Sequence, residues 1–233
     1  MIHHLRPILR RCCLTANTIR YRVEWRRIEE AFRKIGPFET LFDGGAGSGE
    51  FSRRVLKTGL CKRVIALEYD QHNFATLKNN LGRELNTQLI KGSLLEVPLP
   101  DASADAVLCT QVIEHITDHE KAAAELCRVL KPGGHAVITV PRPPEPFNTD
   151  DHKREGYTEE ELRALFAPLG MEPIWEDWFL TRSTTDRMLR AWKWPLGGKF
   201  VPVSWVDRET KTTREQRRAD TPYGLLMLFR KAT

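Results

Sequence analysis

The sequence has no long hydrophobic run and no secretory signal pattern. Its apolar stretches, such as GLLMLF at 224–229, are far shorter than the ~18 residues of a membrane-spanning helix. The first residues, MIHHLRPILRRCCLTAN, carry basic residues inside a short apolar stretch, whereas a signal peptide has its basic residues first. We therefore expect no spanning helix and a cytoplasmic protein.

Cysteine is also scarce, and no two cysteines have the spacing of a metal-binding pair. The five are Cys12, Cys13, Cys61, Cys109 and Cys127. Cys109 and Cys127 lie in apolar patterns typical of a core. Adjacent Cys12 and Cys13 are compatible with lipidation or redox activity, although reduced structural thiols are the favoured interpretation. The sequence thus predicts no metal site.

Charge is unevenly distributed along the chain. The net charge is +5, but residues 1–36 hold nine Lys/Arg against three acids, and residues 182–220 hold ten against five. The flanks are therefore basic, while the rest of the chain, with 17 basic and 23 acidic residues, is acidic. Such asymmetry favours a docking surface for phosphates or anionic lipid, and two solvated helical faces explain it equally well.

Hydrophobic periodicity predicts alternating strands and helices. Helical spacing occurs over residues 19–35, 50–59, 71–82, 117–130 and 158–169. Short apolar runs predict strands within 39–49 and at 62–70, 87–93, 104–112, 135–141, 173–180 and 223–231. This alternation is typical of βαβ units with a mostly parallel sheet covered on both faces. We therefore expect a single Rossmann-like, doubly wound α/β domain with an antiparallel C-terminal strand.

Two capping boxes are predicted. Thr117 with Glu120 opens a helix that runs through Leu130 and that KPGG closes, and Thr158 with Glu161 opens the next helix.

The predicted segments are a basic N-terminal helical segment (1–36), the core (37–181), a Trp-rich basic insertion (182–221) and a final core strand (222–233).

The stretch LFDGGAGSG at 41–49 places an acid and several glycines directly after an apolar pair. Glycine is costly to order, so its use here needs a reason. Glycines between the first strand and its helix let a ligand approach the backbone closely. Gly45, Gly47 and Gly49 are therefore expected to line a cofactor, with Asp43 at the strand end.

Two further residues select the kind of cofactor. Glu50 stands where the dinucleotide fingerprint has its third glycine, and no Gly-Lys-Ser/Thr sequence of a phosphate loop is present. Glu68 ends the second strand about twenty residues after the turn, where an acid accepts bonds from both ribose hydroxyls. The residues favour a nucleoside without a pyrophosphate, and they argue against a nicotinamide-dependent dehydrogenase.

The glycine turn and a later stretch of the sequence resemble a known family. FDGGAGSGEF matches the D-x-G-x-G-x-G motif of class I S-adenosylmethionine-dependent methyltransferases, and GSLLEVPLPDASADAVLCTQVIEHITDHEKAAAELCRVLKPGGHAVITVP resembles the type 11 subgroup that includes quinone-biosynthesis methyltransferases. The resemblance covers residues 38–180 in order and implies S-adenosylmethionine as cofactor and S-adenosylhomocysteine as product. It places Asp43 and the three motif glycines around the methionine part of the cofactor, and Glu68 on its ribose.

The resemblance assigns four more residues to the cofactor. Tyr69 would pack on adenine, with ordinary core or loop packing as a nearly equal alternative. Ser93 stands where the family has an aspartate for the adenine amino group, so adenine recognition is expected to rely on the backbone around Leu94. Gln111 matches the position that closes the methionine side, and the alternative is a strand-end polar residue that faces water.

Methyl transfer from a sulfonium is an in-line displacement, in which an enzyme chiefly aligns the nucleophile and excludes water. Glu114 and His115 follow the fourth strand and are the candidate catalytic residues, with His115 the better base because imidazole titrates near neutral pH. This pair is common in the resembling subgroup with different acceptors, so a structural or cofactor-side role is equally open. His152 either reaches the pocket from its loop or anchors that loop.

Absent motifs narrow the methyl acceptor. The fourth strand lacks the Asn/Asp-Pro-Pro-aromatic motif that family members use on planar amino groups, and no Pro-Cys pair for attack on a pyrimidine is present. The resemblance therefore implies an oxygen or carbon nucleophile on a small-molecule or lipid-like acceptor.

The insertion at 182–221, with Trp192, Trp194 and Trp205, is expected to form a lid that selects the acceptor. A lid that contacts an anionic membrane is the second interpretation, and one that binds RNA is the third. A non-catalytic scaffold that binds the cofactor is the alternative to an enzyme.

Overall fold

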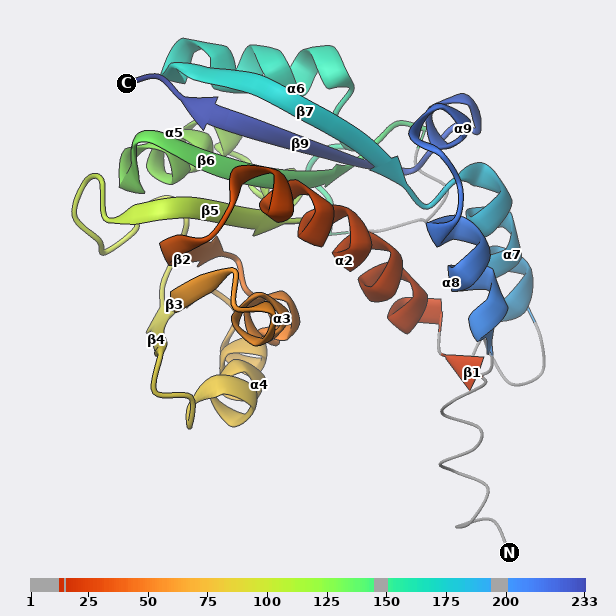
Figure 1. Cartoon of the computed structure of the whole chain (residues 1–233), viewed down its shortest axis with the longest axis horizontal. Helices are drawn as coiled ribbons and strands as arrows, with labels where there is room; N and C mark the ends of the chain where they lie inside the picture. The colour runs from red at the N-terminus through yellow and green to blue at the C-terminus, as the bar shows by residue number, and fades with distance from the viewer. Residues whose placement is uncertain (1–12, 15, 145–150, 194–200) are drawn as a thin grey trace, which may run out of the picture. The chain divides into compact units, whose positions relative to one another are not determined.

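Seven strands form one sheet in the computed structural model of the chain, which describes residues 13, 14, 16–144, 151–193 and 201–233 (Figure 1). The strands are β2 (Phe38–Gly44), β3 (Cys61–Glu68), β4 (Thr87–Lys91), β5 (Ala104–Thr110), β6 (Leu130–Pro141), β7 (Met171–Phe179) and β9 (Gly224–Lys231). Their order across the sheet is β4-β3-β2-β5-β6-β9-β7. The first five pair in parallel, as the alternating pattern predicts.

β9 runs against its neighbour β7. The N–H of Tyr223 donates to the carbonyl of Leu180 at 3.0 Å, and the N–H of Ala232 donates to the carbonyl of Gly170 at 2.8 Å. Because the residue numbers rise along one strand while they fall along the other, the two strands pair antiparallel. The expected antiparallel C-terminal strand is confirmed.

The predicted helices are present within a few residues of their expected bounds. The described helices are α2 (Ala16–Ile35), α3 (Glu50–Thr58), α4 (Gln71–Leu81), α5 (His119–Val129), α6 (Glu159–Phe166), α7 (Arg182–Trp192), α8 (Val203–Thr210) and α9 (Arg214–Ala219), with short 3₁₀ turns η1 (Ile113–His115) and η2 (Ala167–Leu169). α3 and α4 pack beside β3 and β4 (Figure 1). Gly59 and Gly170 end α3 and η2 with φ values of +70° and +72°, a backbone conformation that favours glycine.

The predicted start of α5 is wrong. Asp118, not Thr117, is the N-cap, and its side chain accepts from the N–H of Lys121 at 3.1 Å. Thr117 and Asp118 both have side-chain oxygens that can cap a helix, so the sequence alone does not give a single starting residue. The helix begins after the residue whose oxygen reaches the N–H of the third helical residue. The KPGG sequence lies within β6 instead of capping the helix: Leu130 pairs with Ala104 and His135 with Ala106, so β6 advances five residues where β5 advances two.

The second predicted box is confirmed. The Thr158 side chain accepts from the N–H of Glu161, and the Glu161 side chain accepts from the N–H of Thr158. Cys109 and Cys127 are buried in the core as predicted. Burial raises the pKa of the Cys127 thiol to about 12, so this group stays protonated and unreactive.

The described residues group into two compact units. One consists of residues 29–176 and 225–233 and holds most of the sheet. The other consists of residues up to Ile28 and residues 177–224, and it includes α7, α8, α9 and the antiparallel pair β1 (Cys13–Leu14) and β8 (Val201–Pro202). The bounds of the four segments expected from the sequence stay predictions. Among the described residues, no helix is both long and apolar enough to cross a membrane.

Part of the basic excess in the second unit is internal. Asp177 is fully buried, and Arg217 donates to both of its carboxylate oxygens, with Nη2 at 2.6 Å from Oδ2. Arg27 adds a second guanidinium at 3.6 Å from Oδ2. These arginines neutralise a buried acid rather than face a partner. Trp194 lies outside the described residues, so nothing follows for its predicted place in a lid.

Candidate functional site

The glycine turn connects β2 to α3 at the carboxyl end of the sheet. Gly45, Gly47 and Gly49 all have positive φ, at +81°, +56° and +77°, so each needs the backbone freedom of glycine. A Cβ on Gly45 would lie 2.4 Å from a methyl of Val112, and one on Gly49 would lie 2.6 Å from a methyl of Leu77. Gly45 and Gly49 are therefore packed closely against other side chains of the protein.

Gly47 differs from its neighbours because a Cβ there would meet no described atom within 4 Å. The sequence predicts that a ligand approaches the backbone at all three glycines, and the space for such an approach is present at Gly47. Its N–H donates to Oε2 of Glu68 at 2.7 Å, which ties the turn to the end of β3. Parallel pairing of β2 with β3 brings these two residues together across 21 positions of sequence.

Glu68 is 7% exposed and holds its carboxylate in a fixed orientation. Oε1 accepts from the N–H of Asp70 at 2.7 Å, while Oε2 accepts from Gly47. A carboxylate has about four acceptor positions, so it can still accept bonds from two hydroxyls. A carboxylate held in this way suits the ribose-binding role that the sequence predicts for Glu68.

Asp43 is buried at the end of β2 beside the turn. Its Oδ2 accepts from the hydroxyl of Ser52, and its Oδ1 has no hydrogen-bond partner among the described residues. Burial raises the pKa of Asp43 to about 7, the Ser52 bond opposes this shift, and the charge of Glu68 adds to it. A buried acceptor without a donor suits a cationic ligand group.

The adenine-side candidates follow β3 and β4. Tyr69 is 72% exposed, so its ring is not part of the core, and the ammonium of Lys91 lies 5.2 Å from the ring centroid. Leu94 is buried. The Ser93 hydroxyl accepts from the N–H of Leu95 at 3.1 Å, and its own proton stays available as a donor. The N–H of Gly92 donates to the carbonyl of Glu68 at 3.1 Å and joins this loop to the end of β3.

Gln111 follows β5 in a conformation that is unusual for glutamine, with φ at +53°. Such a residue costs about 1–3 kcal/mol and is often found at functional sites. Its N–H donates to the carbonyl of Thr139 at 2.9 Å. The side-chain Nε2 is buried and has no acceptor among the described residues.

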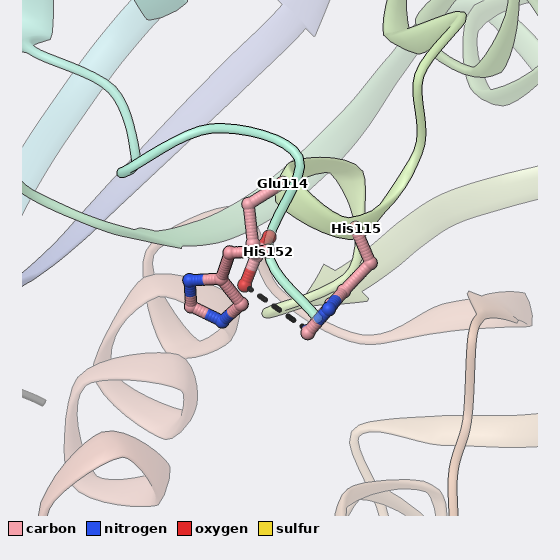
Figure 2. A group of neighbouring side chains, drawn as sticks. All are labelled: Glu114, His115 and His152. Atoms are coloured by element: carbon pink, nitrogen blue, oxygen red, sulfur yellow. Dashed lines mark ion pairs between the residues drawn. The ribbon is translucent and has the colours of Figure 1, made fainter. Parts of the chain in front are cut away.

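The side chains of Glu114, His115 and His152 lie close together (Figure 2). Glu114 is fully buried in η1, and its Oε1 lies 4.0 Å from Nε2 of His115. The rings of His115 and His152 meet edge to face with centroids 4.6 Å apart. The N–H of Lys153 donates to the carbonyl of Glu114 at 2.9 Å. His152, for which the sequence left two roles open, therefore lies beside both candidate catalytic residues.

A family comparison covers the stretch of the chain that holds most of these residues. Residues 42–138 match the family described as "Methyltransferase domain". The match covers less than half of the chain and makes this stretch similar to methyltransferase domains. The match begins in β2, before the glycine turn, and ends in β6, so it includes Asp43, Glu68, Gln111 and Glu114.

Individual methyltransferases resemble parts of the chain. A Mycolicibacterium smegmatis protein named "Probable S-adenosylmethionine-dependent methyltransferase" is 36% identical over 124 residues, which are 49% of this chain and 47% of that protein. The demethylmenaquinone methyltransferase of Renibacterium salmoninarum is 32% identical over 143 residues, which are 60% of this chain and 56% of that enzyme. The chain thus spans about half the length of these relatives.

A solved methyltransferase shares the fold. The N-methyltransferase NodS of Bradyrhizobium japonicum was solved in complex with S-adenosyl-L-homocysteine. It superposes with a TM-score of 0.62 at 13% sequence identity, and the matched region covers 90% of this chain and 86% of the NodS chain. S-adenosylmethionine is the cofactor of this methyltransferase family.

The residues present fit that cofactor. Asp43 offers a buried acceptor for its ammonium, Gln111 offers a buried donor for its carboxylate, and Gly47 has open space beside Glu68 for the ribose. The individual contacts of these residues with S-adenosylmethionine stay predictions.

Proposed function

We propose that this chain is an S-adenosylmethionine-dependent methyltransferase that acts on an oxygen or carbon nucleophile of a small-molecule or lipid-like acceptor. One observation carries the proposal: the Glu68 carboxylate is fixed by the N–H of Gly47, next to the open side of the turn. A carboxylate that is already oriented binds a ribose without first losing its rotational freedom.

Each cofactor-side residue has a defined task in this proposal. Glu68 accepts bonds from the ribose hydroxyls, Asp43 faces the ammonium, and Gln111 donates to the carboxylate of the methionine part. S-adenosylmethionine supplies a methyl group that its sulfonium already activates. The chain has then to position the acceptor and exclude water from it.

Glu114 and His115 form the candidate pair on the acceptor side. An imidazole next to a buried carboxylate can take a proton from an acceptor hydroxyl, because the negative charge stabilises the resulting imidazolium. His115 is partly exposed, so an acceptor can reach its ring, whereas Glu114 is fully buried. In this proposal His115 takes the proton and Glu114 positions it.

The insertion supports the proposed class of acceptor. Its exposed basic residues lie on α7, α8 and α9 and in the turns after them: Arg182, Arg190, Lys193, Arg208, Lys211, Arg214 and Arg218. Exposed basic side chains of this kind suit peripheral contact with an anionic membrane that presents a lipid-like substrate. The proposed location is accordingly the cytoplasm, with the membrane surface as the place of contact.

The test of this function compares two valine variants. S-adenosylmethionine with a labelled methyl group is incubated with the protein and with host extract separated into lipid, small-molecule, RNA and protein fractions. Gly47→Val is expected to abolish label transfer and cofactor binding, because its side chain occupies the open space of the turn. Gly36→Val is the matched control, since Gly36 also has a positive φ, at +76°, and open space around its Cβ position.

The outcomes separate the alternatives. Label in the lipid or small-molecule fraction, lost in Gly47→Val but kept in Gly36→Val, supports the proposal. Label in the RNA fraction would replace the proposed acceptor with a nucleic acid. Cofactor binding without transfer to any fraction would favour the scaffold, and equal behaviour of the two variants would move the cofactor away from Gly47.

A further inference from the structure

We infer that Glu114, His115 and His152 form a binding site for a divalent transition-metal ion of the zinc type. One ligand atom from each side chain, a carboxylate oxygen and two imidazole nitrogens, lies within 4.8 Å of the other two (Figure 2). Two imidazoles with one carboxylate are a donor set of catalytic zinc sites, which keep a fourth position open. The sequence predicted no metal site, because that expectation rested on the spacing of cysteines.

The distances suit metal binding after a small rotation of side chains. Zinc holds nitrogen and oxygen ligands at about 2.0–2.2 Å, so two ligands of a tetrahedral ion are about 3.4 Å apart. Because the donor atoms lie within 4.8 Å of one another, no pair must close by more than about 1.4 Å. His115 and His152 are both partly exposed and can turn without disturbing the core, while Glu114 stays fixed inside.

Asp151 gives the cluster a feature typical of metal sites. Its Oδ2 lies 3.3 Å from Nδ1 of His115, and its carbonyl oxygen lies 3.4 Å from the same nitrogen. A metal-bound histidine almost always donates its second N–H to a carboxylate or a carbonyl, which orients the ring and fixes its tautomer. Here this contact directs Nε2 of His115 toward Glu114. Asp151 is therefore a positioning residue.

The backbone connects the two halves of the site. Glu114 and His115 lie in η1 after β5, and His152 follows β6 on a separate segment. The N–H of Lys153 donates to the carbonyl of Glu114 at 2.9 Å, so the segment with His152 is attached beside the other two ligands. A metal ion would strengthen an attachment that the chain already makes.

One consequence rests on the proposed function. An acceptor hydroxyl bound at the open fourth position of the metal ion would have a lowered pKa, so its O–H bond would break and the proton would pass to water. The resulting oxygen anion then forms a bond to the methyl group as the sulfonium C–S bond breaks, which leaves S-adenosylhomocysteine. With the metal bound, water replaces His115 as the proton acceptor, because the His115 lone pair binds the metal; the cofactor and the class of acceptor in the proposed function are unchanged.

The experiment titrates the full-length, chelator-treated protein with Co²⁺, whose visible d–d absorption reports its ligands, and then with Zn²⁺ as competitor. We expect one Co²⁺ per chain with bands that Zn²⁺ removes. His152→Ala should abolish the bands. Asp151→Asn should weaken binding about 10- to 100-fold, as expected for loss of an outer contact. His72→Ala is the control, since His72 is an exposed histidine on α4.

His3 and His4 form a second histidine pair in the sequence, so the titration is repeated with both replaced by alanine. Bands that persist when His3 and His4 are replaced, and that disappear in His152→Ala, support the inference. No binding, bands that depend on His3 and His4, or bands that survive both His152→Ala and His115→Ala overturn it. Calorimetry with S-adenosylhomocysteine on the same samples keeps the questions apart, because failure of that ligand to bind counts against the proposed function and not against the metal site.

Discussion

Glu68→Ala removes a carboxylate that holds the glycine turn and, in the proposed function, the ribose. Oε2 and Oε1 are each engaged by one backbone N–H at 2.7 Å, and acceptor positions remain for hydroxyls. A hydrogen bond to a charged group contributes about 1.5–3 kcal/mol. Loss of one such bond to the ribose should therefore weaken binding of S-adenosylmethionine about 10- to 150-fold.

The variant should also be less stable. Without Glu68, the N–H groups of Gly47 and Asp70 lose their acceptor, which costs about 1–3 kcal/mol where these groups stay buried. Glu125→Ala is the matched control, because Glu125 accepts from the N–H of Val97 at the same distance of 2.7 Å. Glu125→Ala should reduce stability and leave cofactor affinity unchanged.

Calorimetry with S-adenosylmethionine measures the affinity, and urea unfolding measures the stability of the same preparations. The reasoning is refuted if Glu68→Ala and Glu125→Ala lose equal stability and both keep wild-type affinity. It is also refuted if Glu68→Ala binds normally at full stability, since the ribose must then lie elsewhere.

Three further predictions use urea unfolding. The folded-state pKa of Asp43, about 7, exceeds its ordinary value of 3.8, so the native state holds this proton more tightly than the unfolded state. The free energy of unfolding should therefore fall as the pH rises from about 4 to about 7. Parallel curves of unfolding free energy against pH for wild type and Asp43→Asn would contradict this. Gly45→Ala should be strongly destabilising, since its Cβ meets Val112 at 2.4 Å, whereas Gly47→Ala should cost little beyond its backbone strain; equal losses would reject this difference. Arg217→Met should cost about 3–5 kcal/mol by leaving a buried acid poorly paired, against a small effect for exposed Arg218→Met; equal effects would count against the buried pair.

The order of strands and helices was predictable because local signals agreed with the fold. Apolar runs of strand length and helical spacings alternated along the chain, and glycines such as Gly59 and Gly170 marked helix ends that the structure confirms. The start of α5 was not predictable in the same way. Thr117 and Asp118 both carry capping oxygens, and sequence alone does not decide which one reaches the helix.

The site was predictable only as far as its motif. Asp43 and Glu68 follow neighbouring strands, so their proximity follows from parallel pairing. The bond between Glu68 and Gly47 depends on the path of the turn, and the cluster of His115 with Asp151 joins residues 36 positions apart. Neither contact has a periodic signal. Likewise, a count of charges does not reveal that Arg217 is buried and its neighbour Arg218 is exposed.

The place of β9 in the sheet has a consequence for folding during synthesis. β9 lies between β6 and β7 although it follows both in sequence, so β7 cannot join the sheet until residues 224–231 have left the ribosome. Until then, β6 has an open edge that offers unpaired backbone groups to other chains. Slower translation across residues 177–223 would lengthen this exposure, and chaperone binding to nascent chains should end when β9 is made.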